Sequence, residues 1–206
     1  LADHQVRVIC QYMGGGFGNK NQNQDADLIA ATLSRRANAP VMLEYSRRED
    51  WLGVHGRWPT VQYYRIGVTN DVTVTAMQMN AYSGMGPYRK NSGGISGMDG
   101  YACENLERTI YPVYTNRTVS GNFRAPSEPH GHFGIESMMD EIAYELGMDP
   151  VEFTLKNMLR PTDARPFTNY SLDQCIARGV EMFDWPARRQ VVEVRRRFRK
   201  SLRRHC

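Results

Sequence analysis

The chain has 206 residues, of which 41% are hydrophobic, enough for one substantial core and for two subdomains at most. It contains no run of about 18 apolar residues, which excludes a membrane-spanning helix. Its cysteines (Cys10, Cys103, Cys175 and Cys206) form no C-x-x-C pair, which argues against a zinc or iron–sulfur site and against a disulfide framework.

The net charge of +4 arises at the C-terminal end, where basic residues crowd between Arg188 and Arg204 against the single acid Glu193. A stretch of this kind can contact nucleic acid or another acidic surface. No aromatic platform or recognition-helix pattern accompanies it, so we interpret residues 186–206 as a solvated basic tail. The chain begins at Leu1 without a basic-then-apolar leader, so we expect a cytoplasmic protein that starts inside a longer polypeptide.

The first predicted elements surround a glycine run. Val6–Cys10 has the alternation of a short strand, residues 13–20 read MGGGFGNK, and Asp25–Asn38 reads as a helix. Glycines between a strand and a helix let main-chain N–H groups approach an anion closely. The run fits neither the G-x-G-x-x-G dinucleotide fingerprint nor the phosphate loop, and a simple tight turn is the competing interpretation.

The middle of the chain is predicted to be mainly β. Residues 40–44 resemble a second short strand, and Ser46 with Glu49 forms a capping box before a short helix. Two β-branched runs within residues 60–82, joined at Asn70-Asp71, predict a hairpin. The glycine-rich stretch 83–100 predicts a long irregular loop, and residues 111–121 predict extended structure.

Three helices are predicted in the last part of the chain. The first begins at Glu128, carries apolar residues from Phe133 to Leu146 at helical spacing, and ends at Gly147. The second opens with Pro150, and the third spans residues 172–185 with a capping box of Ser171 and Gln174. The predicted class is therefore α+β, with mixed β-sheets and packed helices.

Three segments together resemble the large subunit of the molybdenum hydroxylases, the xanthine dehydrogenase/aldehyde oxidoreductase family. Residues 11–20 (QYMGGGFGNK) resemble its GGGFGGK loop. Residues 123–129 (FRAPSEP) with 133–143 (FGIESMMDEIA) resemble its FRAPG segment and the helix that follows. Residues 146–158 (LGMDPVEFTLKNM) resemble its LGxDPxExRxKN signature, with Thr154 in place of the arginine. The resemblance spans residues 6 to 185 and implies that residues 1–185 are a molybdopterin-binding domain.

The resemblance implies a molybdenum–molybdopterin cofactor, in the cytosine dinucleotide form usual in bacteria. The pterin holds the metal in this family, so no protein metal ligand is expected. Cofactor-binding residues are expected on the glycine loop and on the arginine segment: Gly15, Gly16, Phe17, Gly18, Arg124 and Ala125. The competing interpretation of Arg124 is a salt bridge with Glu128. For His130 and His132, which lack a third ligand, we expect supporting or structural roles.

Two positions expected to bind the substrate depart from the purine-oxidising branch of this family. Asn21 stands where that branch has a glutamate that binds the purine, and Pro126 stands where it has a stacking aromatic residue. Xanthine is therefore not the expected substrate. The resemblance indicates instead oxidation of an aldehyde or an aromatic heterocycle with water-derived oxygen.

The catalytic glutamate segment of the family has no counterpart in this sequence, and neither Glu136 nor Glu141 matches its position. The chain is therefore expected to carry no catalytic residue and to be inactive alone. Other large-subunit segments or chains, together with iron–sulfur and flavin subunits carrying FAD, are its expected partners. A non-catalytic fragment or assembly module with a basic interaction tail is the alternative, and a nucleotide-binding domain is a third hypothesis.

Overall fold

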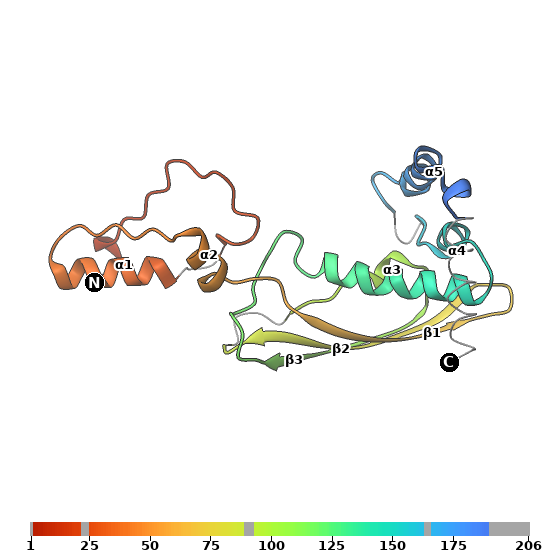
Figure 1. Cartoon of the computed structure of the whole chain (residues 1–206), viewed down its shortest axis with the longest axis horizontal. Helices are drawn as coiled ribbons and strands as arrows, with labels where there is room; N and C mark the ends of the chain where they lie inside the picture. Colours follow the sequence, from red (N-terminus) through yellow and green to blue (C-terminus); the bar gives the residue numbers. More distant parts are fainter. Residues whose placement is uncertain (1, 22–24, 89–92, 163–165, 190–206) are drawn as a thin grey trace.

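The structure is a computed structural model that describes residues 2–21, 25–88, 93–162 and 166–189. The molecule is elongated, with the N-terminal segment at one end, the sheet in the middle and the last helices at the other end (Figure 1). Most of the predicted basic tail lies outside the described residues. In chain order, the elements are η1 Asp3–Gln5, α1 Asp25–Ala37, α2 Arg47–Gly53, β1 Thr60–Val68, β2 Val74–Gly86, η2 Met98–Gly100, β3 Asn105–Tyr114, α3 Glu128–Glu145, α4 Pro150–Asn157 and α5 Leu172–Phe183.

The predicted hairpin forms two strands of a three-stranded mixed sheet with the order β1-β2-β3. β1 pairs antiparallel with β2, and β2 pairs parallel with β3, so the predicted α+β class with a mixed sheet is confirmed. The hairpin turn is held by Thr69, whose N–H donates to the Thr73 carbonyl at 3.0 Å. Hydrogen bonds from the Thr69 and Thr73 hydroxyls hold the pKa of Asp71 below its ordinary value.

The core lies between one face of the sheet and α3. Ile135, Met139 and Ala143 recur every four residues on α3 and are buried against Met77 and Met79 of β2. Phe133, which the sequence places on the apolar face, is 78% exposed instead. It stands two residues before Ile135, which turns its side chain to the opposite side of the helix.

The predicted helices α4 and α5 are present at the far end of the sheet. The Asp149 side chain caps α4 by accepting from the Val151 N–H at 2.8 Å, and it also accepts from the Trp185 indole after α5. The predicted capping box of α5 is wrong. No side-chain hydrogen bond caps this helix, and the Ser171 hydroxyl donates to Asn169 Oδ1 at 3.1 Å.

Two predicted strands are absent from the described structure. Residues 6–10 and 40–44 are neither strand nor helix, and no described residue pairs with them in a sheet. The region predicted to be irregular contains the end of β2 and η2, and the predicted extended stretch begins earlier, at Asn105. Among the described helices, none combines the length and apolarity needed to cross a membrane.

Candidate functional site

The glycine loop follows the first extended stretch and turns sharply. Gly15 and Gly18 have positive φ angles of 131° and 89°, and Phe17 is left-handed with φ 52°. The Asn19 N–H donates to the Gly16 carbonyl at 2.8 Å, and Lys20 Nζ donates to the Gly15 carbonyl at 2.6 Å. Within the described part of the chain, the N–H groups of residues 14–18 have no hydrogen-bond partner. The loop therefore presents unused main-chain donors.

The loop is joined directly to the arginine segment that the sequence singled out. The Arg124 N–H donates to the Phe17 carbonyl with an N···O distance of 2.7 Å. A Cβ atom on Gly18 would come within 3.0 Å of the carbonyl carbon and oxygen of Asn122. Only glycine permits this approach without displacing main chain. The structure thus brings together the predicted residues Gly15, Gly16, Phe17, Gly18, Arg124 and Ala125.

The arginine segment is itself held by Arg57, which the sequence analysis missed. Its guanidinium donates to the Arg124 carbonyl at 2.6 Å and to the Ala125 carbonyl at 3.0 Å, and it lies 5.1 Å from the centre of the Phe123 ring. Ala125 has a left-handed φ of 53°. Arg57 follows no recognisable motif, and its partners are carbonyl oxygens, which every residue carries, so no sequence signal marks it.

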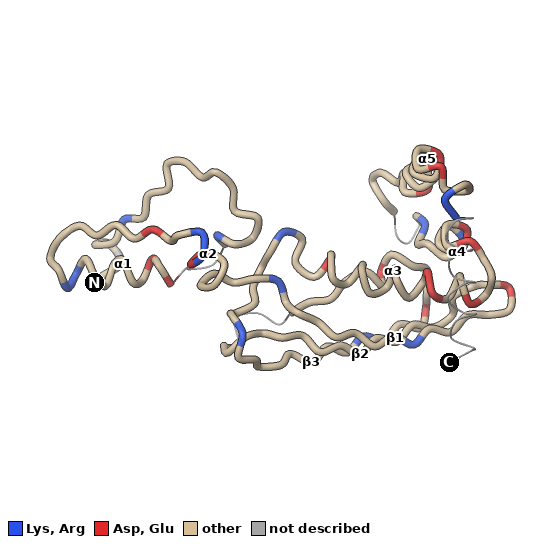
Figure 2. Tube along the Cα trace, viewed as in Figure 1, with Lys and Arg blue, Asp and Glu red and all other residues tan. Residues whose placement is uncertain are grey.

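The Arg124 side chain is exposed and does not form the alternative salt bridge with Glu128. Among the described residues its guanidinium has no ion-pair partner, while the Glu128 carboxylate lies 3.1 Å from His132 Nε2. Figure 2 shows basic residues on the segments around α2 and on the turn before α3. A permanently charged guanidinium is therefore available to an anion beside the glycine loop.

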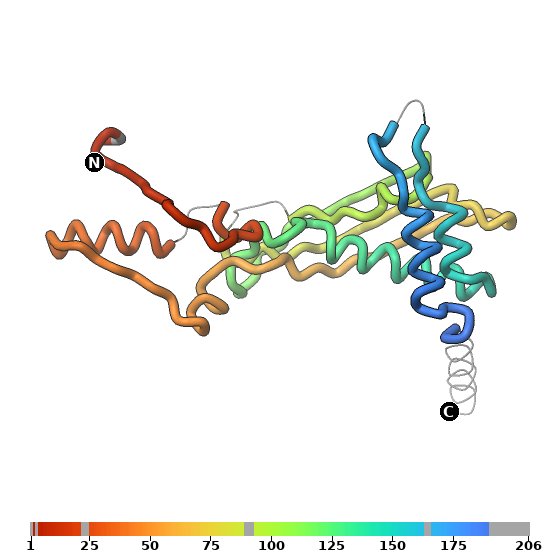
Figure 3. The backbone as a smooth tube through the Cα atoms, turned by 90° about the horizontal axis from the view of Figure 1, so that it is seen from above, coloured from red at the N-terminus to blue at the C-terminus, as the bar shows by residue number. Residues whose placement is uncertain are grey.

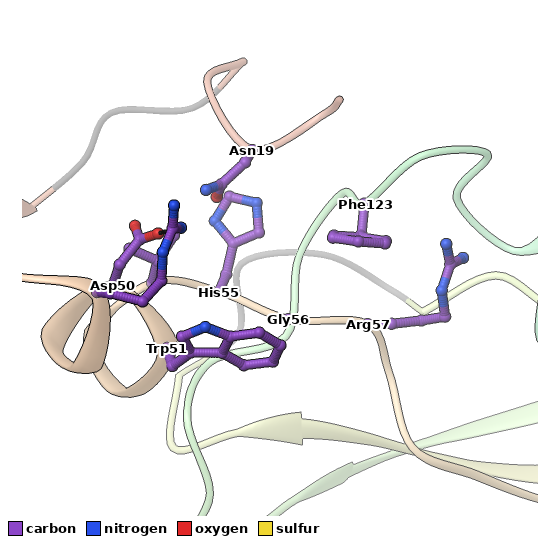
Figure 4. A pocket seen from close by; sticks show the side chains of 9 residues that line it. Asn19, Asp50, Trp51, His55, Gly56, Arg57 and Phe123 are labelled. Carbon is purple, nitrogen blue, oxygen red and sulfur yellow. Dashed lines mark hydrogen bonds and ion pairs between the residues drawn. The ribbon is translucent and has the colours of Figure 1, made fainter. Parts of the chain in front are cut away.

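A hollow of about 440 Å³ opens beside the loop. Figure 4 shows Asn19 above it, Asp50 and Trp51 on α2, His55 and Arg57 on the following segment, and Phe123 opposite. Nε2 of the His55 ring lies 2.9 Å from the Asn122 carbonyl oxygen. His55 therefore contacts the same segment of main chain that Arg57 holds. The residues that line the hollow are Asn19, Arg47, Asp50, Trp51, Val54, His55, Gly56, Arg57 and Phe123.

The sequence pointed to the hollow only in part. The capping box of Ser46 and Glu49 correctly placed α2: the Glu49 N–H donates to Ser46 Oγ at 3.3 Å, and the Ser46 N–H donates to Glu49 Oε2 at 2.8 Å. Nothing in the sequence distinguished Trp51 or His55 from ordinary surface residues. The hollow is bounded by Asn19 and Phe123, the neighbours of the predicted loop and arginine residues, rather than by Phe17 and Arg124 themselves.

The remaining predicted positions lie around this centre. Asn21 and Pro126 are exposed and do not line the hollow, so their contacts with a substrate stay predictions. His130 Nε2 lies 2.9 Å from the Gly94 carbonyl, a contact that ties α3 to the preceding loop. Within the described residues, no group of three or more His, Cys, Asp or Glu side chains could hold a metal ion.

Comparison with known proteins identifies the family of this chain. Residues 1–158 match the molybdopterin cofactor-binding domain family. The chain is 33% identical over 199 residues to the putative xanthine dehydrogenase molybdenum-binding subunit XdhA of Escherichia coli K12, covering 89% of this chain and 26% of the relative. It is 31% identical over 187 residues to the aldehyde oxidoreductase molybdenum-binding subunit PaoC of Escherichia coli O157:H7, covering 89% and 26%.

Solved structures show the same fold. The aldehyde oxidoreductase from Desulfovibrio gigas superposes with a TM-score of 0.71 at 28% identity, covering 81% of this chain and 19% of that chain. Quinoline 2-oxidoreductase from Pseudomonas putida 86 superposes with a TM-score of 0.75 at 26% identity, covering 89% and 26%. The chain thus spans about a quarter of the length of the curated relatives it matches. It belongs to the molybdopterin cofactor-binding domain family of the molybdenum hydroxylases.

Proposed function

We propose that this chain forms part of a molybdenum hydroxylase and holds the pterin-borne molybdenum cofactor between its glycine loop and its arginine segment. The observation that carries the proposal is the direct contact of the two segments, in which the Arg124 N–H donates to the Phe17 carbonyl at 2.7 Å. When bound, this cofactor supplies the transfer of water-derived oxygen to a substrate and accepts the two electrons released.

The loop fits an anionic, closely approaching cofactor. Its N–H groups at Gly16, Phe17 and Gly18 lack partners in the described part of the chain. Gly14 faces open space, since a Cβ atom placed there would meet no atom within 4 Å. Bare main chain of this kind can lie against a flat ligand and donate hydrogen bonds to it.

The charged side chains beside the loop also fit an anionic cofactor. Arg124 supplies a permanently charged, directional donor, and Lys20 adds a second exposed cation at the end of the loop. Arg57 holds the Arg124 and Ala125 carbonyls and so fixes the main chain from which the Arg124 side chain extends.

The finer assignments follow from the same family membership. We infer the cytosine dinucleotide form of the cofactor, and iron–sulfur and flavin subunits as electron-carrying partners in a cytoplasmic complex. The substrate is an aldehyde or an aromatic heterocycle that approaches Asn21 and Pro126. This chain contributes cofactor binding and positioning, while the general base comes from polypeptide outside it. Residues 1–185 form the domain, and residues 186–206 form its basic tail.

The test is the molybdenum content of the assembled complex. The chain is purified with the polypeptides that complete its subunit, and molybdenum is measured against protein by mass spectrometry. Near-stoichiometric metal is expected in the complex, falling several-fold in Arg124→Ala but not in Arg65→Ala, an exposed arginine on β1. A complex that folds and assembles without metal contradicts the proposal and favours a non-catalytic assembly module.

A further inference from the structure

Three buried polar side-chain atoms have no hydrogen-bond partner among the described residues. They are Trp58 Nε1, Ser83 Oγ and His130 Nδ1. Trp58 is 4% exposed, and Ser83 is fully buried. A buried polar group without a partner costs free energy, and ordered water molecules commonly bind such groups in native proteins. Each of the three atoms therefore needs a partner that the described side chains and main chain do not supply.

The three residues come from different elements but meet at the main chain of Gly93 and Gly94. A Cβ atom added to Gly93 would collide with Ser83 Oγ and would lie 3.2 Å from Trp58 Cδ1, the ring atom bonded to Nε1. The ring centres of Trp58 and His130 are 6.4 Å apart, and His130 Nε2 lies 2.9 Å from the Gly94 carbonyl oxygen. The three atoms therefore belong to one group, the Trp58–Ser83–His130 cluster.

The position of the cluster follows from the fold. Trp58 lies in the segment after α2, Ser83 lies near the end of β2, and His130 lies in the first turn of α3. Figures 1 and 3 show that these three parts of the chain lie at the same end of the sheet, the end nearest to α2. A ligand of the cluster therefore joins three elements at this end.

The hydrogen-bonding roles of the three groups are complementary to those of water. The Trp58 indole N–H can only donate. The Gly94 carbonyl can only accept, so His130 Nε2 carries a proton and Nδ1 of the uncharged ring is an acceptor. The Ser83 hydroxyl can donate or accept. A ligand that accepts from Trp58 and donates to His130 satisfies both, and water is the smallest molecule that does so.

Two further hollows give water a route to the cluster. Trp58 lines a hollow of about 640 Å³ beside α2, together with Arg117 and Ser120. His130 lines another hollow of about 360 Å³ between β1 and α3, together with Gln62. Two members of the cluster are therefore next to polar surface that solvent can reach, so a water molecule need not cross the apolar core.

We propose that the Trp58–Ser83–His130 cluster is a binding site for an ordered water molecule, which accepts from Trp58 Nε1, donates to His130 Nδ1 and hydrogen-bonds to Ser83 Oγ. Three polar partners are the usual number for a buried water. The site consists of this chain's own residues and needs no cofactor, so it stands or falls independently of the proposed function.

The bound water has a consequence for the arginine segment. Trp58 adjoins Arg57, whose guanidinium donates to the Arg124 and Ala125 carbonyls. His130 lies in the helix that the arginine segment enters. The water therefore links the two elements that hold this segment, and it does so through hydrogen bonds that no apolar contact replaces.

A high-resolution crystal structure of the full chain tests the site directly. We expect density for one water molecule within about 3.2 Å of Trp58 Nε1, Ser83 Oγ and His130 Nδ1. Direct hydrogen bonds of these atoms to one another or to another side chain would overturn the proposal. A cluster without density for a water molecule would also overturn it.

Two serine substitutions test the same site in solution. Ser120 is the matched control, because it is also buried and its hydroxyl donates to the Gly84 carbonyl at 2.9 Å. If water binds Ser83 Oγ, Ser83→Ala and Ser120→Ala should each lower the melting temperature of the full chain by about 2–4 °C. If Ser83 Oγ is without a partner, its removal relieves a buried unsatisfied group. An unchanged or higher melting temperature in Ser83→Ala, with the expected fall in Ser120→Ala, therefore contradicts the proposal.

Discussion

The Arg124 N–H donates a hydrogen bond to the Phe17 carbonyl at 2.7 Å and so ties together two motifs that lie far apart in the sequence. Because the bond uses main-chain atoms, it leaves the Phe17 ring and the Arg124 guanidinium free to face a ligand. Phe17 is 66% exposed, and Arg124 has no ion-pair partner among the described residues. The contact therefore gives the proposed cofactor site its geometry, while the Phe17 ring and the Arg124 guanidinium stay available.

Removal of the guanidinium tests the role of Arg124. If the proposed function holds, Arg124→Ala in the assembled complex is expected to lower turnover of an aldehyde by about 10- to 100-fold, as loss of a charged hydrogen bond does. The fold should be retained, because the side chain is exposed and forms no ion pair with a described residue. Steady-state kinetics and circular dichroism check both statements. Normal turnover would remove Arg124 from the site.

The close approach at Gly18 predicts a difference between two glycines of one loop. Gly18→Ala is expected to destabilise the chain by about 1–3 kcal/mol, because the position has φ 89° and the added Cβ would meet Asn122 main chain at 3.0 Å. Gly14→Ala, where a Cβ meets nothing within 4 Å, is expected to change stability by less than about 0.5 kcal/mol. Urea denaturation measures both values, and equal values would show that the loop does not pack against residue 122.

The two carbonyls held by Arg57 predict that lysine cannot replace it. Arg57→Lys keeps the charge but loses the planar guanidinium, which donates to the Arg124 and Ala125 carbonyls together. We therefore expect the free energy of unfolding to fall by about 1.5 kcal/mol. Arg65→Lys, at an exposed position on β1, serves as the matched control. Unfolding midpoints of the two variants give the comparison. Equal unfolding midpoints for Arg57→Lys and the control would show that the two guanidinium hydrogen bonds add nothing to stability.

Partial burial of Tyr64 on β1 predicts a loss of stability at alkaline pH. Burial raises the pKa of Tyr64 to about 12 from an ordinary value near 10. Between these values the unfolded chain releases the proton and the folded chain retains it, so stability falls as pH rises through this window. Denaturation at successive pH values should show a shallower fall for Tyr64→Phe. If stability falls with pH equally steeply in the two proteins, Tyr64 does not contribute to the pH dependence of stability.

The sequence predicted the elements whose stability comes from within the described chain. The hairpin, α3 and α4 were found because alternation, helical spacing and caps such as Asp149 act locally and are satisfied by neighbours in the same sheet or helix. Residues 6–10 and 40–44 carry an equally clear strand pattern, yet they form no strand. A strand needs a hydrogen-bonded neighbour, and the alternation of side chains alone does not identify that neighbour.

The parts of the candidate site that belong to sequence motifs were predictable. The parts that depend on how the chain packs were not. The glycine run and the FRAP segment were predicted to form one site because of a family resemblance, and the structure places them in contact. Arg57, His55 and Trp51 could not be found, because their roles depend on where the chain folds back. Arg57 and His55 bind carbonyl oxygens, which leave no trace in a side-chain pattern.

The proposed function depends on the glycine loop and the arginine segment touching the cofactor. Amide exchange of the assembled complex, prepared with and without molybdopterin, measures this directly. We predict that the amides of Gly16, Phe17 and Gly18 slow markedly when the cofactor is bound, while the hairpin turn at Thr69 is unchanged. Identical exchange at residues 16–18 in the loaded and the cofactor-free complex would contradict this contact.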